Sequence, residues 1–160
     1  MPDASALPAQ PAPAVPPHVE SVDTQYLESL VGYNARRAAL AIIAQFLPRM
    51  APYDLRPVDF SVLSLVAHNP GITSRQLCGT LNILPPNLVG MVGQLEKRNL
   101  IERLPHPRDR RAAGLHLTPD GETLVREAEL RVAALEEEAT ARLTAAERKT
   151  LMRLLQKIYR

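Results

Sequence analysis

The segment Leu100–Leu117, which reads LIERLPHPRDRRAAGLHL, restricts the fold more than any other part of the chain. Two short apolar-bearing stretches flank a charged loop, and this pattern predicts a two-stranded hairpin with a cationic tip. The loop contains Arg108, Asp109, Arg110 and Arg111. A helix-like run ends at Asn99, and a helix start follows at Thr118. The order helix, strand, strand, helix therefore predicts a rigid frame that points its arginines outward.

Positive charge is concentrated in the middle of the chain, although the whole sequence has a net charge of only +2. Residues 1–35 carry four acids and no lysine or arginine, whereas residues 119–160 carry eight acids and eight bases. Residues 36–118 hold the remaining 11 bases and 5 acids, a net of +6. Such charge is typical of polyanion binding, because neutralised phosphates release counterions, although chance clustering on a solvated surface would look the same. Arginines on a hairpin tip also suit the electronegative minor groove of DNA.

The composition is that of one globular domain, with 46% hydrophobic and 22% charged residues. No run of 18 apolar residues exists, and no basic residue precedes Arg36, so we predict neither a membrane span nor a secretory signal. Cys78 is the single cysteine and cannot form an internal disulfide, which agrees with a reducing compartment. We therefore expect a cytoplasmic protein, and we interpret Cys78 as a small core residue rather than a redox sensor.

Periodicity and capping signals predict a series of helices after a Pro/Ala-rich arm at residues 1–22, which we expect to be extended or disordered. The first helix runs from roughly Asp23 to Leu47, where Pro48 interrupts the apolar pattern. The next three run from Pro57 to His68, from Thr73 or Ser74 to Leu81, and from Pro85 to Arg98. Thr118 and the capping box Thr144–Glu147 begin the last two helices.

Two short helices joined by a tight turn and followed by a hairpin predict a winged helix-turn-helix, whose second helix enters the major groove of DNA. We expect a mainly α fold with a two- to three-stranded β wing. Its parts are a dimerisation helix at 23–50, the winged helix-turn-helix DNA-binding domain at 51–118 and C-terminal dimerisation helices at 119–160. Apolar stripes near both chain ends favour a homodimer, unless these helices fold back on their own subunit.

Four sequence words carry a family resemblance, in family order and spacing: PGIT at 70–73, LEKRNLIER at 95–103, DRR at 109–111 and LTPDG at 117–121. Through them, Leu55 to about Glu129 resembles the MarR family of bacterial transcriptional regulators. The resemblance implies an obligate homodimer that binds double-stranded DNA at a palindromic operator. It also implies a ligand-responsive regulator, most often a repressor that a small aromatic or phenolic acid releases.

We predict ten DNA-binding residues: Arg75, Gln76, Pro86, Asn87, Leu88, Val89, Arg108, Asp109, Arg110 and Arg111. The resemblance assigns the minor-groove contact to Arg111, and Asp109, two residues away, could hold its guanidinium in one orientation. Asn87 is a candidate reader of adenine on an otherwise weakly hydrogen-bonding recognition helix. Gly90 and Gly93 lower helix propensity, which indicates close approach of DNA or of a neighbouring helix, or simply tolerated drift.

For the effector we predict four ligand-binding residues: Tyr33, Asn34, Arg37 and His68. An arginine with a tyrosine and a histidine could clamp an aromatic acid, although each side chain could equally be a satisfied buried polar group or a subunit contact.

An enzyme is not expected, because the four histidines are scattered and the sequence has no HExxH, GxSxG or phosphate-loop motif. We also predict no metal site and no cofactor. The alternative that remains is a winged helix that only binds proteins, and steep salt dependence on duplex DNA with sequence preference would decide against it.

Overall fold

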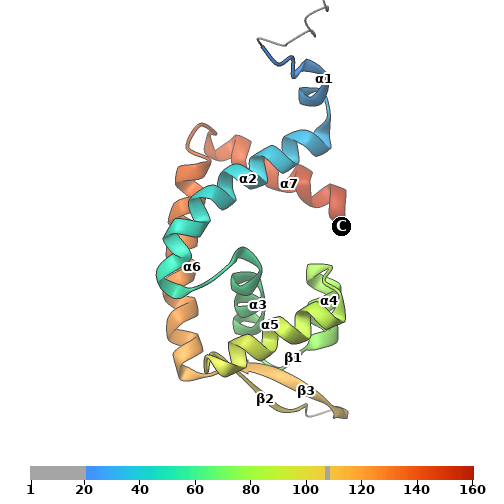
Figure 1. The fold of residues 1–160 in the computed structure, drawn as a ribbon, viewed down its shortest axis with the longest axis vertical. Coiled ribbons are helices and arrows are strands. Elements are labelled where there is room, and N and C mark those ends of the chain that lie inside the picture. The colour runs from blue at the N-terminus through green and yellow to red at the C-terminus, as the bar shows by residue number, and fades with distance from the viewer. Residues whose placement is uncertain (1–20, 107–108) are drawn as a thin grey trace, which may run out of the picture.

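The computed structural model describes residues 21–106 and 109–160, and the side chains of residues 106–112 are also outside the described part. All but the last two residues of the predicted arm therefore lie outside it. In chain order the elements are α1 (Gln25–Glu28), α2 (Val31–Met50), the 3-10 helix η1 (Ala51–Tyr53), α3 (Pro57–His68), β1 (Ile72–Thr73), α4 (Ser74–Leu81), α5 (Pro85–Lys97), β2 (Ile101–His106), β3 (Asp109–Leu117), α6 (Pro119–Ala139) and α7 (Ala145–Tyr159). Figure 1 shows α1, α2 and α7 above a lobe of α3, α4, α5 and the sheet, with α6 running along both levels.

Three helices begin at the threonines that the sequence predicts as caps. The Oγ1 atom of Thr73 accepts a hydrogen bond from the backbone N–H of Gln76 at 3.3 Å, and Thr144 caps Glu147 in the same way at 3.3 Å. The hydroxyl of Thr118 accepts from the backbone N–H of Gly121 at 3.1 Å. Each bond satisfies an amide that the first turn of a helix leaves without a backbone partner.

The predicted first helix is wrong at its N-terminal end, because the structure breaks it at Ser29 and Leu30 into α1 and α2. The side-chain amide of Asn34 donates to the backbone carbonyls of Glu28 at 2.7 Å and Leu30 at 2.8 Å. It thereby satisfies two acceptors at the point where the helical ladder is interrupted.

The predicted stop at Pro48 is also wrong, because α2 continues through this residue to Met50. Proline removes only one backbone donor here, near the end of the helix. Phe46 and Met50, four residues apart and hence on one helix face, are both buried. Packing of this face against the core therefore outweighs the local cost of the proline.

The wing is a three-stranded antiparallel sheet in the order β1-β3-β2. Ile72 pairs with Leu115, and Ile101 pairs with Leu117. The turn before β1 depends on Gly71, which has a φ of 87°, and on Gly114 of β3, where a Cβ would lie 2.9 Å from the Gly71 Cα atom. The close approach of the turn before β1 to the neighbouring strand β3 is thus possible only with very small residues at this point.

One hydrophobic core joins the lobe to the long helices. Its largest fully buried side chains come from α2 to α6 and include Met50, Leu63, Leu77, Leu95, Leu115 and Leu135. The Phe46 and Phe60 rings meet edge to face, with centroids 5.9 Å apart. Cys78 is partly buried and packs against this core.

The start of α6 is in direct contact with the backbone that leads into the wing. A Cβ on Gly121 would lie 2.1 Å from the carbonyl oxygen of Leu100, and the backbone N–H of Thr118 donates to that oxygen at 3.2 Å. Asn99, with a φ of 55°, turns the chain in the left-handed region, and its amide donates to Asp120 at 2.8 Å. This junction positions the hairpin relative to α6.

Candidate nucleic-acid interface

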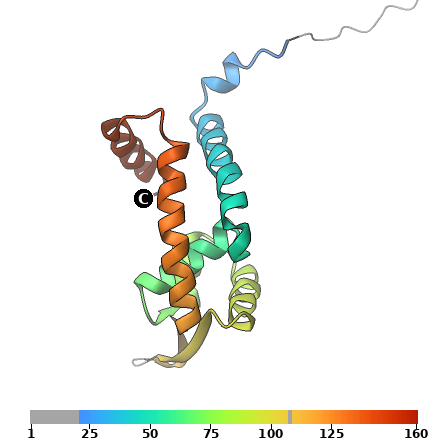
Figure 2. The same cartoon turned by 90° about the vertical axis from the view of Figure 1, so that its left-hand side faces the viewer.

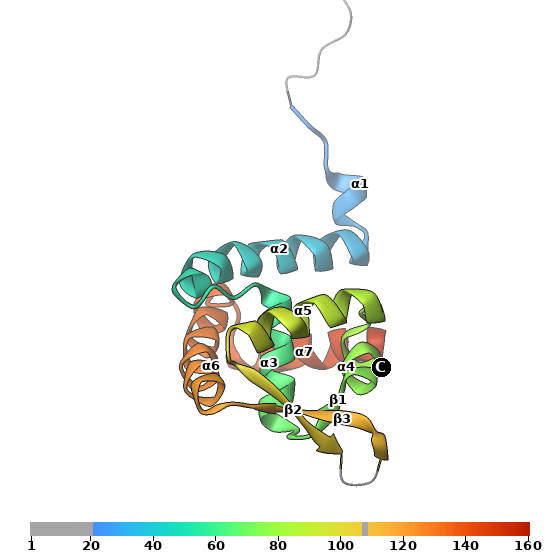
Figure 3. The same cartoon turned by 60° about the horizontal axis from the view of Figure 1, so that its bottom comes forward.

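Helix α5 and the β2–β3 hairpin lie side by side on one face of the lobe (Figure 3). The short turn through Asn99 carries the chain directly from α5 into β2. The hairpin arginines Arg108, Arg110 and Arg111, together with Asp109, have side chains outside the described part. Their predicted DNA contacts therefore stay predictions, while the backbone of β3 from residue 109 onward is placed beside β2.

The inner and outer faces of α5 differ sharply in burial. Leu88 has 0% of its surface exposed, and Val92 and Leu95 are buried on the same face. The predicted contact of Leu88 with DNA is therefore wrong, because this side chain is part of the core. The apolar spacing of 88, 92 and 95 is the signal that identifies the inward face. Pro86, Asn87 and Val89 are exposed and remain available for the predicted contacts.

Gly90 and Gly93 leave the backbone of α5 open on its accessible side. A Cβ built on either glycine meets no atom of the described chain within 4 Å. Close packing against a neighbouring helix of the same chain is therefore not the reason for these glycines.

The first turn of α4 presents Arg75 and Gln76 to solvent. The Oε1 atom of Gln76 accepts a hydrogen bond from the backbone N–H of Thr73 at 2.9 Å, so this side chain completes a capping box. Gln76 therefore stabilises the helix that carries Arg75, and its amide nitrogen remains available for a phosphate.

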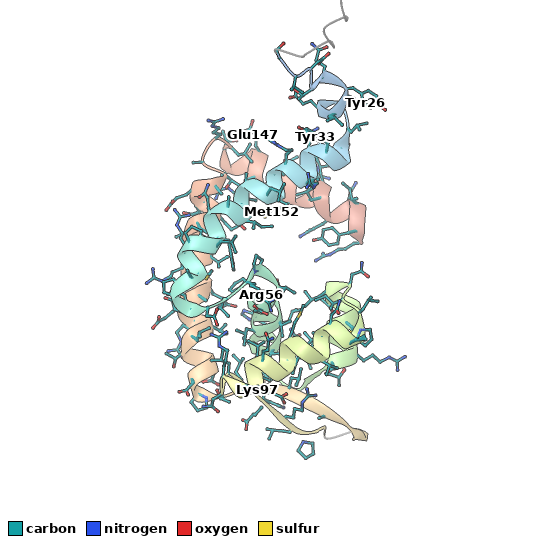
Figure 4. The ribbon with its side chains drawn as sticks, in the orientation of Figure 1. Tyr26, Tyr33, Arg56, Lys97, Glu147 and Met152 are labelled. Atoms are coloured by element: carbon teal, nitrogen blue, oxygen red, sulfur yellow. The ribbon has the colours of Figure 1, made fainter. Side chains whose placement is uncertain are left out.

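The four predicted effector residues do not form one cluster. Asn34 lines a 610 Å³ groove between α2 and α7, together with Ser29, Val31, Ala35, Ala38, Ala39, Ile42, Leu151 and Leu155. Tyr33 and Arg37 are on the same helix but do not line the groove, and Figure 4 shows Tyr33 near the α1 end of α2. The His68 Nε2 atom lies 2.9 Å from Glu129 Oε1, in a contact between α3 and α6.

A polar cluster at the corner after α2, which the sequence analysis missed, links α5 to α6. The guanidinium of Arg98 donates to the backbone carbonyls of Tyr53 at 2.6 Å and Asp54 at 2.8 Å. The Tyr53 hydroxyl donates to Glu127 at 3.1 Å and accepts from Arg131 at 2.6 Å. These partners are 44 to 78 residues apart in sequence, so no local sequence pattern predicts their contacts.

Next to this cluster, Arg56 and Asp59 form a two-point ion pair at the start of α3. The Arg56 Nε atom lies 2.8 Å from Asp59 Oδ2, and this hydrogen bond raises the pKa of Arg56. Asp59 is buried and therefore needs this partner. Arg56 and Lys97, both labelled in Figure 4, line a 490 Å³ cavity that also holds Asp54 and Asp59. The mixed signs of charge indicate a structural contact rather than an anion site.

Large apolar side chains are exposed at both ends of the described chain. Near the N-terminal end they are Val22, Tyr26, Leu27, Leu30 and Val31, and on α7 they are Leu151, Met152, Leu154, Leu155, Ile158 and Tyr159. Figure 2 shows α2 alongside α6, with α7 at the end of these two helices that lies away from the sheet. An apolar surface of this extent is unusual on a monomer.

Among the side chains that the structure describes, those of residues 21–105 and 113–160, no group of three or more His, Cys, Asp or Glu could hold a metal ion. Within the same ranges, no helix combines the length and the apolar character that crossing a membrane requires.

Known proteins resemble this chain both in sequence and in fold. A model of the MarR family matches residues 55–113. A Thauera aromatica protein assigned to regulation of the hcr operon is 34% identical over 131 residues, which cover 81% of this chain and 79% of the relative. The multiple antibiotic resistance protein MarR of Salmonella typhimurium is 36% identical over 110 residues, covering 68% of this chain and 76% of MarR.

Among solved structures, the transcriptional repressor CouR bound to a 23-mer DNA duplex has a TM-score of 0.81 and 38% identity, covering 88% of this chain and 99% of CouR. CouR bound to p-coumaroyl-CoA has a TM-score of 0.78 and 35% identity, with the same coverage. Sequence identity at this level over most of both chains, together with the same winged-helix fold, shows that this chain and these relatives belong to one family. The chain therefore belongs to the MarR family of transcriptional regulators.

Proposed function

We propose that this chain is a ligand-responsive repressor that binds a palindromic operator as a homodimer and is released by a small aromatic or phenolic acid. The observation that carries the proposal is the shared face of α5 and the β2–β3 hairpin. A recognition helix and a wing on one face can engage adjacent major and minor grooves at the same time.

The exposed apolar residues of α1, α2 and α7 support the homodimer. Val31 at the start of α2 is 68% exposed and Ile158 on α7 is 68% exposed, so a single chain leaves the apolar side chains of these helices incompletely covered. A twofold axis lets each patch cover its counterpart in a second copy, because isologous interfaces use the same surface twice. Two DNA-binding lobes then present two recognition helices to two half-sites.

The groove between α2 and α7 supports an aromatic effector. Its volume of 610 Å³ is in the range of small-ligand sites, and its lining is mostly alanine and leucine with Asn34 as a polar edge. CouR, a structural relative, binds p-coumaroyl-CoA. We propose a hydroxylated aromatic acid or its thioester as the effector of this chain, with Asn34 as its polar contact in the groove; the roles of Tyr33, Arg37 and His68, which do not line the groove, stay sequence-based predictions.

The DNA part of the proposal is tested with the full chain. Sedimentation should give a dimer, and enrichment from a random duplex library should yield palindromic half-sites. Fluorescence anisotropy on the enriched duplex should show affinity that falls steeply with salt. Arg111→Ala should weaken this binding by about 1–3 kcal/mol and lower the salt slope by about one unit per subunit. A monomer, or binding without sequence preference, would contradict the proposal.

The effector part is tested by adding p-coumarate, 4-hydroxybenzoate or p-coumaroyl-CoA to the protein–DNA complex. At least one should release the duplex and raise the melting temperature of the free protein. Ala38→Leu, which fills the groove, should keep DNA affinity and lose the response. Ala133→Leu, at an exposed position of α6 outside the groove, is the matched control and should respond normally.

A further inference from the structure

The start of α5 presents a contiguous apolar surface to solvent. We define the apolar tip as Leu84, Pro85, Pro86 and Val89. Leu84 is 70% exposed and Val89 is 62% exposed, and both prolines are exposed as well. Val89 stands one turn after the prolines, so these side chains are neighbours on one helix face. Exposed apolar side chains that are neighbours, rather than scattered singly, are a feature of interaction sites.

The tip has almost no capacity to form hydrogen bonds. Pro85 and Pro86 occupy the first two positions of α5 and have no backbone N–H. The backbone amide of Asn87 donates to the carbonyl of Leu84 at 3.0 Å, and the Leu88 amide donates to the same oxygen at 3.2 Å. The free amides with which a helix N-terminus usually binds phosphate are therefore missing or engaged. The tip itself therefore offers apolar contact, while the neighbouring Asn87 side chain can still form hydrogen bonds.

We propose that the apolar tip reads the 5-methyl groups of thymine in the major groove, with Val89 as the specificity-determining residue. This inference rests on the proposed function as a DNA-binding repressor. In the major groove, the thymine methyl is the one apolar group on a base edge. An apolar helix tip that enters this groove thus gains most over thymine and gains little over the polar edges of the other bases.

The surroundings of the tip favour DNA over an apolar protein partner. Arg75 is exposed on the neighbouring helix α4, and residues 36–118 carry a net charge of +6. A Cβ placed on Gly90, next to Val89, would have no atom of the described chain within 4 Å, so the helix backbone can come close to the base edges. Charge at the periphery and apolar contact at the centre match a phosphate-lined groove with methyl groups on its floor.

The test uses duplexes that the full chain enriches from a random library. Each thymine of a half-site is replaced in turn by deoxyuridine, which removes the methyl group and leaves every hydrogen bond in place. Burial of one methyl is worth about fourfold in affinity, so at least one thymine should show a loss of about fourfold, and the symmetric pair about 16-fold. Deoxyuridine in the flanks of the duplex is the control and should have no effect.

A second measurement assigns the effect to Val89. In Val89→Ala the loss caused by deoxyuridine at the contacted thymine should fall to less than about twofold, because the partner of the methyl is gone. Leu130→Ala, at a 71% exposed position of α6, is the matched control and should keep the full effect. Sequence-specific binding that no deoxyuridine weakens, or a loss that is unchanged in Val89→Ala, overturns the inference alone. Failure to bind any duplex overturns the proposed function together with it.

Discussion

The substitution Gly90→Ala should make the protein more stable and its DNA complex weaker. Alanine is about 1 kcal/mol more favourable than glycine inside a helix. The structure offers no clash to offset this gain, since a Cβ on Gly90 meets no described atom within 4 Å. For a chain of this size, 1 kcal/mol corresponds to a rise in melting temperature of about 2–4 °C.

The effect on DNA binding should have the opposite sign. If the backbone of α5 approaches the base edges at Gly90, an added methyl group must displace the helix or the base. Overpacking of a closely packed contact costs about 1–3 kcal/mol, which corresponds to about 5- to 150-fold in affinity. Thermal unfolding followed by circular dichroism gives the first quantity, and fluorescence anisotropy on the enriched duplex gives the second.

Gly79→Ala on α4 is the matched control, because its Cβ also meets no described atom within 4 Å. It should raise the melting temperature by a similar amount and change DNA affinity by less than about twofold. Wild-type DNA affinity in Gly90→Ala would refute the idea that this glycine faces the duplex. A lower melting temperature would show that our account of α5 as an unobstructed helix is incorrect.

Three further outcomes follow from contacts within the lobe and the long helices. Gly121→Ala places a Cβ 2.1 Å from the backbone oxygen of Leu100. Urea denaturation should therefore show that the free energy of unfolding falls by about 1–3 kcal/mol. An unchanged midpoint would contradict the close contact. Arg98→Ala removes two charge-assisted hydrogen bonds to backbone carbonyls and should cost about 1.5–3 kcal/mol, whereas Lys97→Ala, at an exposed position, should stay within about 0.5 kcal/mol. Hydrogen bonds from Thr144 lower the pKa of Glu147 below its ordinary value of 4.5; the stabilisation is therefore present above that value and is lost as the pH falls through the folded pKa. Between about pH 5 and pH 3, Glu147→Gln should show a smaller fall in melting temperature than the wild type, and parallel curves would argue against the capping role.

The sequence predicts those parts of the fold that depend on neighbouring residues. Thr73, Thr118 and Thr144 are recognisable as caps because the side chain and the amide that it satisfies are only three residues apart. The break before α2 is not predictable in this way, because it depends on Asn34 reaching back six residues to the carbonyl of Glu28. Pro48 is misleading because its local cost is visible in the sequence and the compensating burial is not.

The candidate site, like the fold, has parts that neighbouring residues predict and parts that depend on distant contacts. Two short helices, a tight turn and the following hairpin predict a winged helix-turn-helix from the sequence alone. The prediction for Leu88 chose the wrong face of α5, although the spacing from Val92 and Leu95 identifies the core side. The Tyr53 cluster could not be predicted, because it needs Arg98 and Arg131 to meet a loop 45 and 78 residues away. The parts that could not be predicted depend on contacts between residues far apart in the sequence, and not on weak local structural preferences.

The contact between Gly121 and Leu100 makes α6 a lever arm. The first turn of α6 is packed directly against the backbone that leads into the wing, because a Cβ atom added to Gly121 would already overlap the Leu100 carbonyl. Helix α6 has 21 residues and therefore a length of about 30 Å. A tilt of about 5° over that length displaces one end by about 2.6 Å relative to the other. An event at the α7 end of this arm would thus change the position of the wing by most of the spacing between successive base pairs.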